Sequence, residues 1–517
     1  MFLKKTSTTF KDLAKCVKLE ISNNKVIYTL LFLILIGAFF VRAYRTTDLM
    51  AFHYDQARDA LKIWRFWHEG DIFVVGPVTG LAGIFLGPLY YFMIAPLYLV
   101  SGGSPLYPAL FLACLVVVAI FITYLIGKEM QGRVTGLMAA FIVSFSYYLV
   151  LAGRWVSNPT PIFLGSAFLF YALYKIIMTG RNIWWLVVAV AVSASLQFEA
   201  ASAFFYLPIL AIFYWWQKGK RPSKKIALLA TAVFFVSIVP QIIFGLAHQN
   251  MLFENFINVF TKERSFRLNF WDVLDTRANY FWTVFASKIL PTREKLVWPL
   301  LAFSLIGILS WKNKHKADIL KLFLIFLGTP VVFYTLFQGN HGNMYDYYMT
   351  GYYIPMIILF ALGLGALWQK SLYGKIVVFT FLIWFAQVNG ILTRYYLIAG
   401  VDGPTHVSLG NELQAVRWVY EDGKTVGRFN TDFYVPPVIP YTYDYLFLWQ
   451  GSRLCSDDFC GWEREKSTQI VYILYEVDPP HPERLTNWLA KYTNTTIVLD
   501  EMSFGGITVQ KRQRLMQ

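Results

Sequence analysis

Long runs of apolar residues, almost free of charge, recur along the chain from residue 26 to residue 394. A helix of about 20 apolar residues is the length that crosses the hydrocarbon core of a bilayer. Of the 517 residues, 56% are hydrophobic and only 15% are charged. A soluble domain of this size cannot bury so much apolar surface. The sequence therefore predicts a polytopic α-helical membrane protein.

The charged residues fall between the apolar runs and predict how the chain is oriented. Residues 1–25 form a basic segment before the first run, which lacks the small-residue cleavage site of a signal peptide. The net charge of +15 comes from short Lys and Arg clusters of this kind. Such clusters follow the positive-inside rule, so we predict a cytoplasmic N-terminus, membrane lipids as partners and no nucleic acid. The plasma (inner) membrane is the expected location.

The stretch Leu81–Val100 decides the sidedness of everything after it. Its glycines and prolines suit a bent segment that does not cross the membrane. If it does not cross, the short basic loops that follow all lie inside; if it crosses, they all lie outside. The positive-inside rule therefore predicts about 11 spans. They make a transmembrane domain at 26–398, with a first outer loop at 45–104 and a long outer loop at 247–296.

Residues 399–517 have a different pattern. Helical patterns near 408–422 and 482–492 are combined with strand-like runs at 469–475, 495–499 and 506–510. This mixture predicts a small α/β domain, which the topology places on the extracytoplasmic side. Cys455 and Cys460 lie in it without further Cys or His partners for a metal. They form either a local disulfide or two free thiols, and the sequence leaves both open.

The segment Phe52–Asp59 follows the first span and is crowded with polar groups. Asp55, Arg58 and Asp59 share one face if this segment is helical. The apolar and basic residues that follow alternate with helical period, which predicts an amphipathic helix of interfacial type. Asp55 then either caps the start of that helix or takes part in chemistry.

Further polar residues gather at the predicted outer ends of spans, where ionisable groups are costly and often functional. Each also has a structural alternative, such as anchoring a span end, beginning a helix, forming an ion pair or contacting lipid headgroups. The candidate substrate-binding residues are Arg58, Asp59, Arg154, Asn158, Gln197, Glu199, Arg264, Arg267, Lys288, His341 and Tyr345.

The order and sidedness of these motifs over about residues 26–400 resemble the GT-C glycosyltransferases. The nearest branch is that of the protein O-mannosyltransferases and the lipid A aminoarabinose transferase. The resemblance is carried by the acidic segment after the first span, Gly-Pro-Leu-Tyr-Tyr at 87–91, Gly-Lys-Glu at 127–129, Gly132-Arg133, Gly-Arg-Trp at 153–155, Asn158-Pro159 and Gln197.

This resemblance implies an enzyme that takes a sugar from a polyprenyl-phosphate carrier at the outer leaflet. The sugar passes to a hydroxyl of a protein, lipid or glycan acceptor with inversion at the anomeric centre. The position that matches the catalytic acidic residue is Asp55, acting as a base. Many relatives have a second acidic residue directly after it, where this chain has Gln56, and another near Asn158. No cofactor is certain, and a divalent metal is open, because hard cations prefer several oxygen ligands.

Two other function classes remain. The chain has no P-loop, no strand–helix GxGxxG, no HExxH and no Gly-x-Ser-x-Gly, which excludes ATP-driven transport and the common hydrolases. A transporter or flippase of lipid-linked saccharides would need a polar path to the cytoplasmic side. A non-catalytic membrane scaffold would leave Asp55 replaceable. The polar clusters at the outer ends of spans favour the enzyme.

Overall fold

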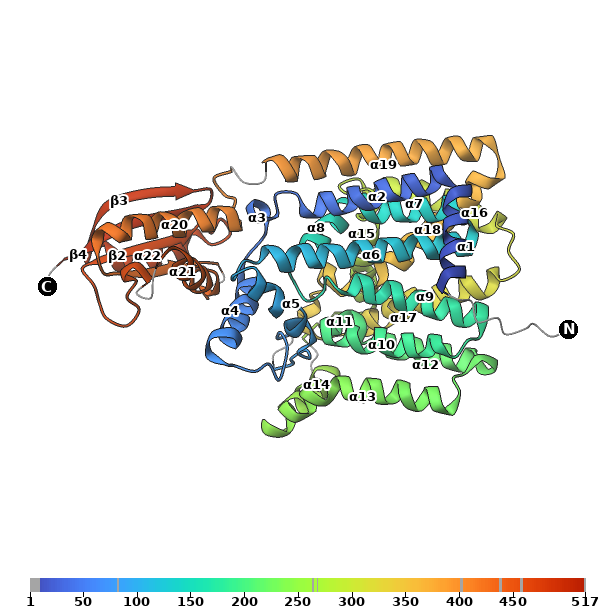
Figure 1. Ribbon diagram of the computed structural model, residues 1–517, viewed down its shortest axis with the longest axis horizontal. Helices are drawn as coiled ribbons and strands as arrows, with labels where there is room; N and C mark the ends of the chain where they lie inside the picture. Colours follow the sequence, from blue (N-terminus) through green and yellow to red (C-terminus); the bar gives the residue numbers. More distant parts are fainter. Residues whose placement is uncertain are drawn as a thin grey trace.

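The computed structural model describes residues 10–80, 83–262, 265–266, 268–399, 403–436, 439–455 and 459–515. A bundle of long, roughly parallel helices makes up most of the chain. A small domain with a sheet lies at one end of the bundle, and the helix Phe10–Asn23 lies at the other (Figure 1). The bundle contains the helices α1 (Phe10–Asn23), α2 (Lys25–Ala43), α3 (Thr46–Leu49), α4 (Tyr54–Glu69), α5 (Leu89–Val100), α6 (Leu106–Gln131), α7 (Arg133–Phe145), α8 (Tyr147–Arg154), α9 (Ile162–Thr179), α10 (Ile183–Phe198), α11 (Ala200–Ala203), α12 (Tyr206–Trp216), α13 (Lys224–Ala247), α14 (Met251–Thr261), α15 (Phe270–Ala286), α16 (Val297–Ser310), α17 (Lys316–Leu336), α18 (Thr350–Lys370) and α19 (Leu372–Ala399).

Seven helices in the described residues are long and apolar enough to cross a membrane, and the pair α7 and α8, bent by 64°, makes an eighth candidate. The prediction of a polytopic helical membrane protein is confirmed. The count of eleven also needs α10, α12 and α16, which have 16, 11 and 14 residues. These are shorter than the usual span, so eleven remains a prediction.

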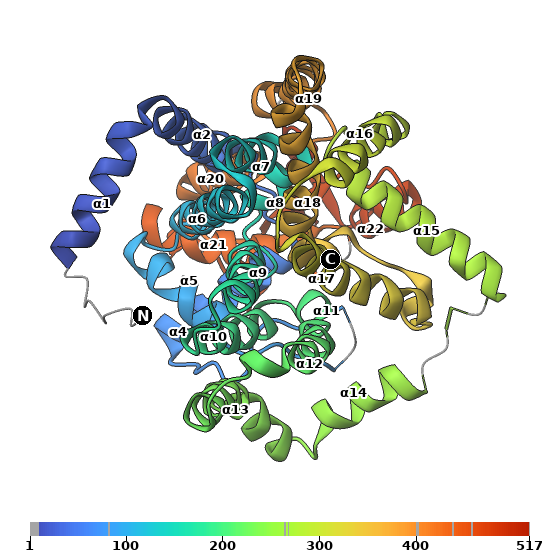
Figure 2. The same ribbon diagram turned by 90° about the vertical axis from the view of Figure 1, so that its right-hand side faces the viewer.

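The view along the bundle shows its layers (Figure 2). Helices α6, α9 and α18 lie near the centre, and α18 is almost wholly buried. Helices α1, α13, α14, α15 and α19 lie at the periphery, and the apolar side chains of α13 are exposed or half-buried. Exposed apolar helices of this kind are what a surrounding bilayer covers.

Helix α5 contains most of the stretch on which the predicted topology depends. It has 12 residues, which span about 18 Å at 1.5 Å per residue, against about 30 Å for the hydrocarbon core. Its buried tyrosines pack against α4 and α6. The helix is therefore too short to cross by itself, as the non-crossing interpretation requires.

Helix α4 has the predicted amphipathic period, but protein covers its apolar face. It begins after His53, whose backbone N–H donates to Gln56 Oε1 at 3.3 Å, and it ends at Gly70 in the left-handed region. Ala57, Ala60 and Ile63 are buried between α5 and a helix of the small domain. The expectation that lipid covers this face is therefore not met.

The small domain is of the predicted α/β type. Its elements are α20 (Leu409–Val426), β1 (Phe429–Tyr434), α21 (Tyr441–Leu454), β2 (Ile470–Glu476), α22 (Pro482–Thr493), β3 (Thr496–Phe504) and β4 (Ile507–Arg514). The sheet order is β1-β2-β4-β3, with β1 parallel to β2 and β4 antiparallel to both its neighbours. A disulfide joins Cys455 and Cys460, which settles the alternative left open by the sequence.

Candidate active site

A cavity of about 430 Å³ lies at the end of the bundle nearest the small domain. The start of α4, the turn after α8, the junction of α10 and α11, and the segment before α18 form its walls. Its lining is mainly apolar and aromatic, with a few polar groups. The lining residues that carry the argument below are Asp55, Arg58, Asn158, Glu199, Asn340 and Tyr347.

Asp55 lies in the first turn of α4 and faces this cavity. Its side chain is 50% exposed and accepts a hydrogen bond from Arg58 Nη1 at 2.8 Å. His53 is the N-cap residue, and Gln56 completes the cap with the backbone of His53. The capping alternative for Asp55 is therefore not supported, and its carboxylate is available to a ligand in the cavity.

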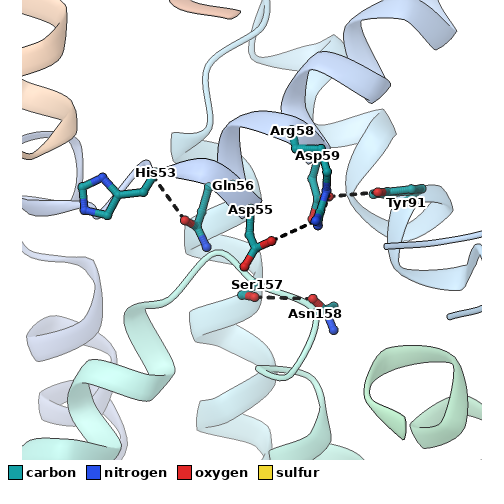
Figure 3. Close-up of polar contacts among 8 residues, drawn as sticks. All are labelled: His53, Asp55, Gln56, Arg58, Asp59, Tyr91, Ser157 and Asn158. Carbon is teal, nitrogen blue, oxygen red and sulfur yellow. Dashed lines mark hydrogen bonds and ion pairs between the residues drawn. The ribbon is translucent and has the colours of Figure 1, made fainter. Parts of the chain in front are cut away.

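Arg58 joins Asp55 to a second carboxylate behind it (Figure 3). Its Nε and Nη2 donate to Asp59 Oδ1 at 3.0 and 2.8 Å, and the Tyr91 hydroxyl donates to the same oxygen at 2.9 Å. Asp59 is buried and does not line the cavity. Burial raises the pKa of Asp59 to about 6, although Arg58 and Tyr91 oppose the shift. Asp59 thus holds Arg58, and Arg58 holds Asp55.

Asn158 and Glu199 lie together on another wall. Asn158 Nδ2 donates to the Phe198 carbonyl at 2.6 Å, which ties the turn after α8 to the end of α10. The Glu199 carboxylate accepts the N–H groups of Ala201 and Ser202 at 2.7 and 2.6 Å and so caps α11. Among the described residues, no basic side chain forms an ion pair with Glu199, so the ion-pair alternative is not supported. Both residues line the same cavity as Asp55.

Two predicted site residues lie outside the cavity and connect helices instead. Arg154 is buried, donates to the Val41 carbonyl at 2.9 Å and lies 5.5 Å from the centre of the Tyr396 ring, so it joins α8 to α2 and α19. Gln197 donates to the Ser237 carbonyl at 2.5 Å and joins α10 to α13. Sequence position placed both at span ends, but it could not show which way the side chains point.

Lys288 lies in a second, smaller pocket of about 290 Å³. It is 1% exposed and pairs with Asp346 Oδ2 at 2.7 Å, between the rings of Tyr148 and Tyr353. Burial lowers the pKa of Lys288, and Asp346 opposes that shift. Trp155, Pro159 and Tyr347 line both pockets, so the two spaces are neighbours. The partner Asp346 was not among the predicted site residues.

Of the remaining predicted residues, His341 and Tyr345 lie near the rim of the cavity. Arg264 and Arg267 fall outside the described residues. Their neighbour Ser265 accepts a hydrogen bond from the His341 N–H at 2.7 Å, beside the lining residue Asn340. Tyr345 is about half exposed and stacks on Tyr347 at a ring distance of 5.6 Å. His341 and Tyr345 do not line the cavity themselves.

The described residues do not supply a donor set that fits a divalent cation. They contain no group of three or more His, Cys, Asp or Glu side chains placed to hold a metal ion. In the cavity, the partner of Asp55 is a guanidinium, and the oxygens of Glu199 accept backbone N–H groups. These cavity residues therefore do not offer the set of free oxygen ligands that a hard cation prefers.

Comparison with known proteins shows which families and structures this chain resembles. Residues 86–244 match a family described as dolichyl-phosphate-mannose-protein mannosyltransferase. No curated protein sequence matches. Among solved structures, ArnT from Cupriavidus metallidurans bound to undecaprenyl phosphate aligns with a TM-score of 0.59 at 10% identity, over 94% of this chain and 98% of that one. Its apo state aligns with a TM-score of 0.58 at 10% identity, over 95% and 98%. The apo oligosaccharyltransferase of Archaeoglobus fulgidus gives 0.46 at 11% identity, over 81% and 63%.

Proposed function

We propose that this chain, which has the GT-C glycosyltransferase fold and resembles the ArnT and protein mannosyltransferase branch, transfers a sugar from a polyprenyl-phosphate carrier to an acceptor hydroxyl. The observation that carries the proposal is the cavity with Asp55 on its wall, half exposed and held by Arg58. The similar ArnT structure was solved with undecaprenyl phosphate bound. A carrier of that chemical class fits a cavity that combines apolar walls with a few fixed polar groups.

The proposed reaction is a single displacement at the anomeric carbon. The acceptor oxygen attacks C1, the C1–O bond to the phosphate breaks, and polyprenyl phosphate leaves with the electron pair. Attack from the face opposite the leaving group inverts the anomeric centre. Asp55 takes the proton of the acceptor hydroxyl, which is the role of a general base. Arg58 fixes the direction of that carboxylate, because it is itself held by buried Asp59.

The other groups of the cavity are assigned to binding. Asn158 and Glu199 line the same cavity as Asp55 and are proposed to bind sugar hydroxyls. Phe204, Phe205 and Phe256 provide an apolar wall for the first isoprene units of the carrier. The leaving phosphate gains negative charge as the bond breaks, and cations stabilise that charge. Arg264 and Arg267 are proposed for this role, since the adjacent Ser265 lies at the rim.

The test is a transfer assay with the purified full chain and labelled polyprenyl-phosphate sugars. Asp55→Asn keeps the size of the side chain but cannot accept the proton. We expect turnover to fall at least ~100-fold, the usual scale of general base catalysis, with carrier-lipid binding retained.

Asp71→Asn is the matched control. Asp71 lies just after the end of α4 that is far from Asp55, and it pairs with Lys62, so this change should leave turnover unchanged. Near-normal turnover in an Asp55→Asn protein that still binds carrier would contradict the proposed base. Movement of labelled saccharide across vesicles without transfer to an acceptor would favour the flippase instead.

A further inference from the structure

The segment that leads into Asp55 is held by the small C-terminal domain. The backbone N–H of Leu409, the first residue of α20, donates to the Met50 carbonyl at 2.9 Å. The Thr442 hydroxyl, in the first turn of α21, donates to the Phe52 carbonyl at 3.0 Å. Two carbonyls of residues 50–53, which have no regular secondary structure, therefore find their partners in the C-terminal domain.

Aromatic packing continues this contact along α4. Phe52 is fully buried against Tyr445, with ring centres 5.7 Å apart, and Tyr54 lies 5.2 Å from Tyr441. On the bundle side, the Tyr396 hydroxyl donates to the Leu49 carbonyl at 3.1 Å. The bundle thus fixes the chain up to Leu49, and the C-terminal domain fixes it from there to the start of α4.

Glu412 adds a third contact of an unusual kind. It is 0% exposed, its Oε1 lies 3.9 Å from His53 Nδ1, and neither of its carboxyl oxygens has a hydrogen-bond partner in the described structure. The groups that face it are His53 at the start of α4, Glu476 at the end of β2 and Tyr443 on α21. Burial and Glu476 raise the pKa of Glu412 well above its usual value. The Glu412 carboxyl lies beside the His53 ring, two residues before Asp55.

We propose that the C-terminal domain is a positioning element of the active site, and that Thr442 and Glu412 are the residues through which it holds Met50–His53 and thereby Asp55. This inference rests on the proposed function, since it assigns the contact to the direction of the base. A carboxylate that must meet an acceptor hydroxyl at hydrogen-bond distance loses rate steeply when its backbone shifts. The contacts are made to the backbone and to the N-cap residue, so they fix where α4 begins.

The test uses pairs of variants that separate the contact from folding. Thr442→Val removes the hydroxyl at constant size, and Thr442→Ser keeps it. We expect Thr442→Val to lower kcat about ten-fold, the scale of one hydrogen bond, with unchanged KM for the carrier sugar, and Thr442→Ser to restore kcat. Glu412→Ala should act like Thr442→Val. Glu412→Gln, which has the size of the neutral acid, should retain activity.

Amide hydrogen exchange of residues 50–56 gives a readout that does not depend on catalysis. It should be faster in Thr442→Val and Glu412→Ala than in the wild type. It should be unchanged in Lys511→Gln, which breaks the pair with Asp422 elsewhere in the same domain. Unchanged exchange and kcat in both variants would overturn the inference, as would equal losses in Thr442→Ser and Thr442→Val. A wild-type protein that transfers no sugar while the exchange results hold would overturn the proposed function alone.

Discussion

Asp55 and Asp59 share one arginine, yet their surroundings give them different properties. Asp59, on the buried face of α4, accepts hydrogen bonds from Arg58 and Tyr91 and has a pKa raised to about 6 by that burial. Asp55 is half exposed at the cavity. Arg58 lies between them, so buried Asp59 supports Arg58, and Arg58 holds Asp55, the proposed base.

Arg264, Arg267 and Lys288 of the long outer loop were predicted to bind substrate, and only Lys288 lies among the described residues. Lys288 is buried and paired with Asp346, whereas Arg264 and Arg267 belong to the loop whose Ser265 lies at the rim. We expect Arg264→Gln or Arg267→Gln to weaken binding of carrier lipid about ten-fold, the scale of one charge-assisted hydrogen bond. Lys288→Gln should leave that affinity unchanged and lower the unfolding temperature, because it removes an ion pair and two cation–π contacts.

Binding of labelled carrier lipid and thermal unfolding of the same preparations check both expectations. Equal affinity for all three variants would remove the loop from the phosphate site. A loss of affinity confined to Lys288→Gln would move the phosphate to the smaller pocket.

The sequence predicted which residues lie at the candidate site better than it predicted what each of them does. Asp55, Arg58, Asn158 and Glu199 do meet at one cavity, because chain order and span ends predict which loops come together. Arg154 does not reach that cavity, although it lies at the same end of a helix. The direction of a side chain depends on helix rotation and on partners from distant parts of the chain, such as the Val41 carbonyl. The local sequence determines neither the rotation of the helix nor these distant partners.

Among the helices and strands, hydrophobic period and composition predicted those elements whose local residue preference agrees with their packing. The helix at α4 and the three strands β2, β3 and β4 were predicted from their patterns. Helix α21 was missed, because its sequence is rich in tyrosine and phenylalanine, which favour strands. Its aromatic side chains pack against α4, and this burial outweighs the local preference. Strand β1 was also missed, since only its first and last residues are buried.

The buried carboxyls of Glu412 and Glu476 predict that the C-terminal domain loses stability as pH rises. Burial raises the pKa of Glu476 to about 7 and raises that of Glu412 well above its usual value. The folded domain therefore binds protons more tightly than the unfolded chain, and the stability from this binding is lost as pH rises through the folded pKa. Between pH 6 and pH 8, ionisation of Glu476 alone should lower the free energy of unfolding by about 1.4 kcal/mol.

Thermal unfolding at pH 6 and pH 8 measures this effect. Glu476→Gln should reduce the difference in unfolding temperature between the two pH values, because glutamine cannot ionise. Asp59 titrates lower, with a pKa of about 6, so most of its contribution falls below this interval. Lys491→Gln, which breaks an exposed pair with Asp432 in the same domain, is the control and should keep the wild-type pH dependence. The same slope in Glu476→Gln as in the wild type would rule out this carboxyl as its source.

For the whole molecule, the distribution of basic loops predicts more than any single motif. The C-terminal domain lies at the end of the bundle that holds the cavity, and helix α1 lies at the opposite end (Figure 1). At that opposite end, Glu20 of α1 pairs with Lys128 and Arg133, which belong to the predicted cytoplasmic side. These two pairs hold the pKa of Glu20 down at about 2. The fold therefore separates the basic side from the side of the site, as the positive-inside rule requires.

Labelling of single cysteines tests this sidedness for the whole chain. In a background with Cys16 and Cys114 replaced by serine, Asp71→Cys and Lys424→Cys should react with an impermeant thiol reagent applied to intact cells. Lys314→Cys should react only after the membrane is opened. All three positions are exposed, so access to them depends on the membrane and not on burial in the protein. Asp71 lies just before the stretch with α5, and Lys424 lies in α20, so together they test both ends of the predicted topology. If Asp71→Cys and Lys424→Cys were protected while Lys314→Cys was labelled, the chain would have the opposite orientation in the membrane. That orientation would place Asp55 in the cytoplasm and remove the basis for an outer-leaflet donor.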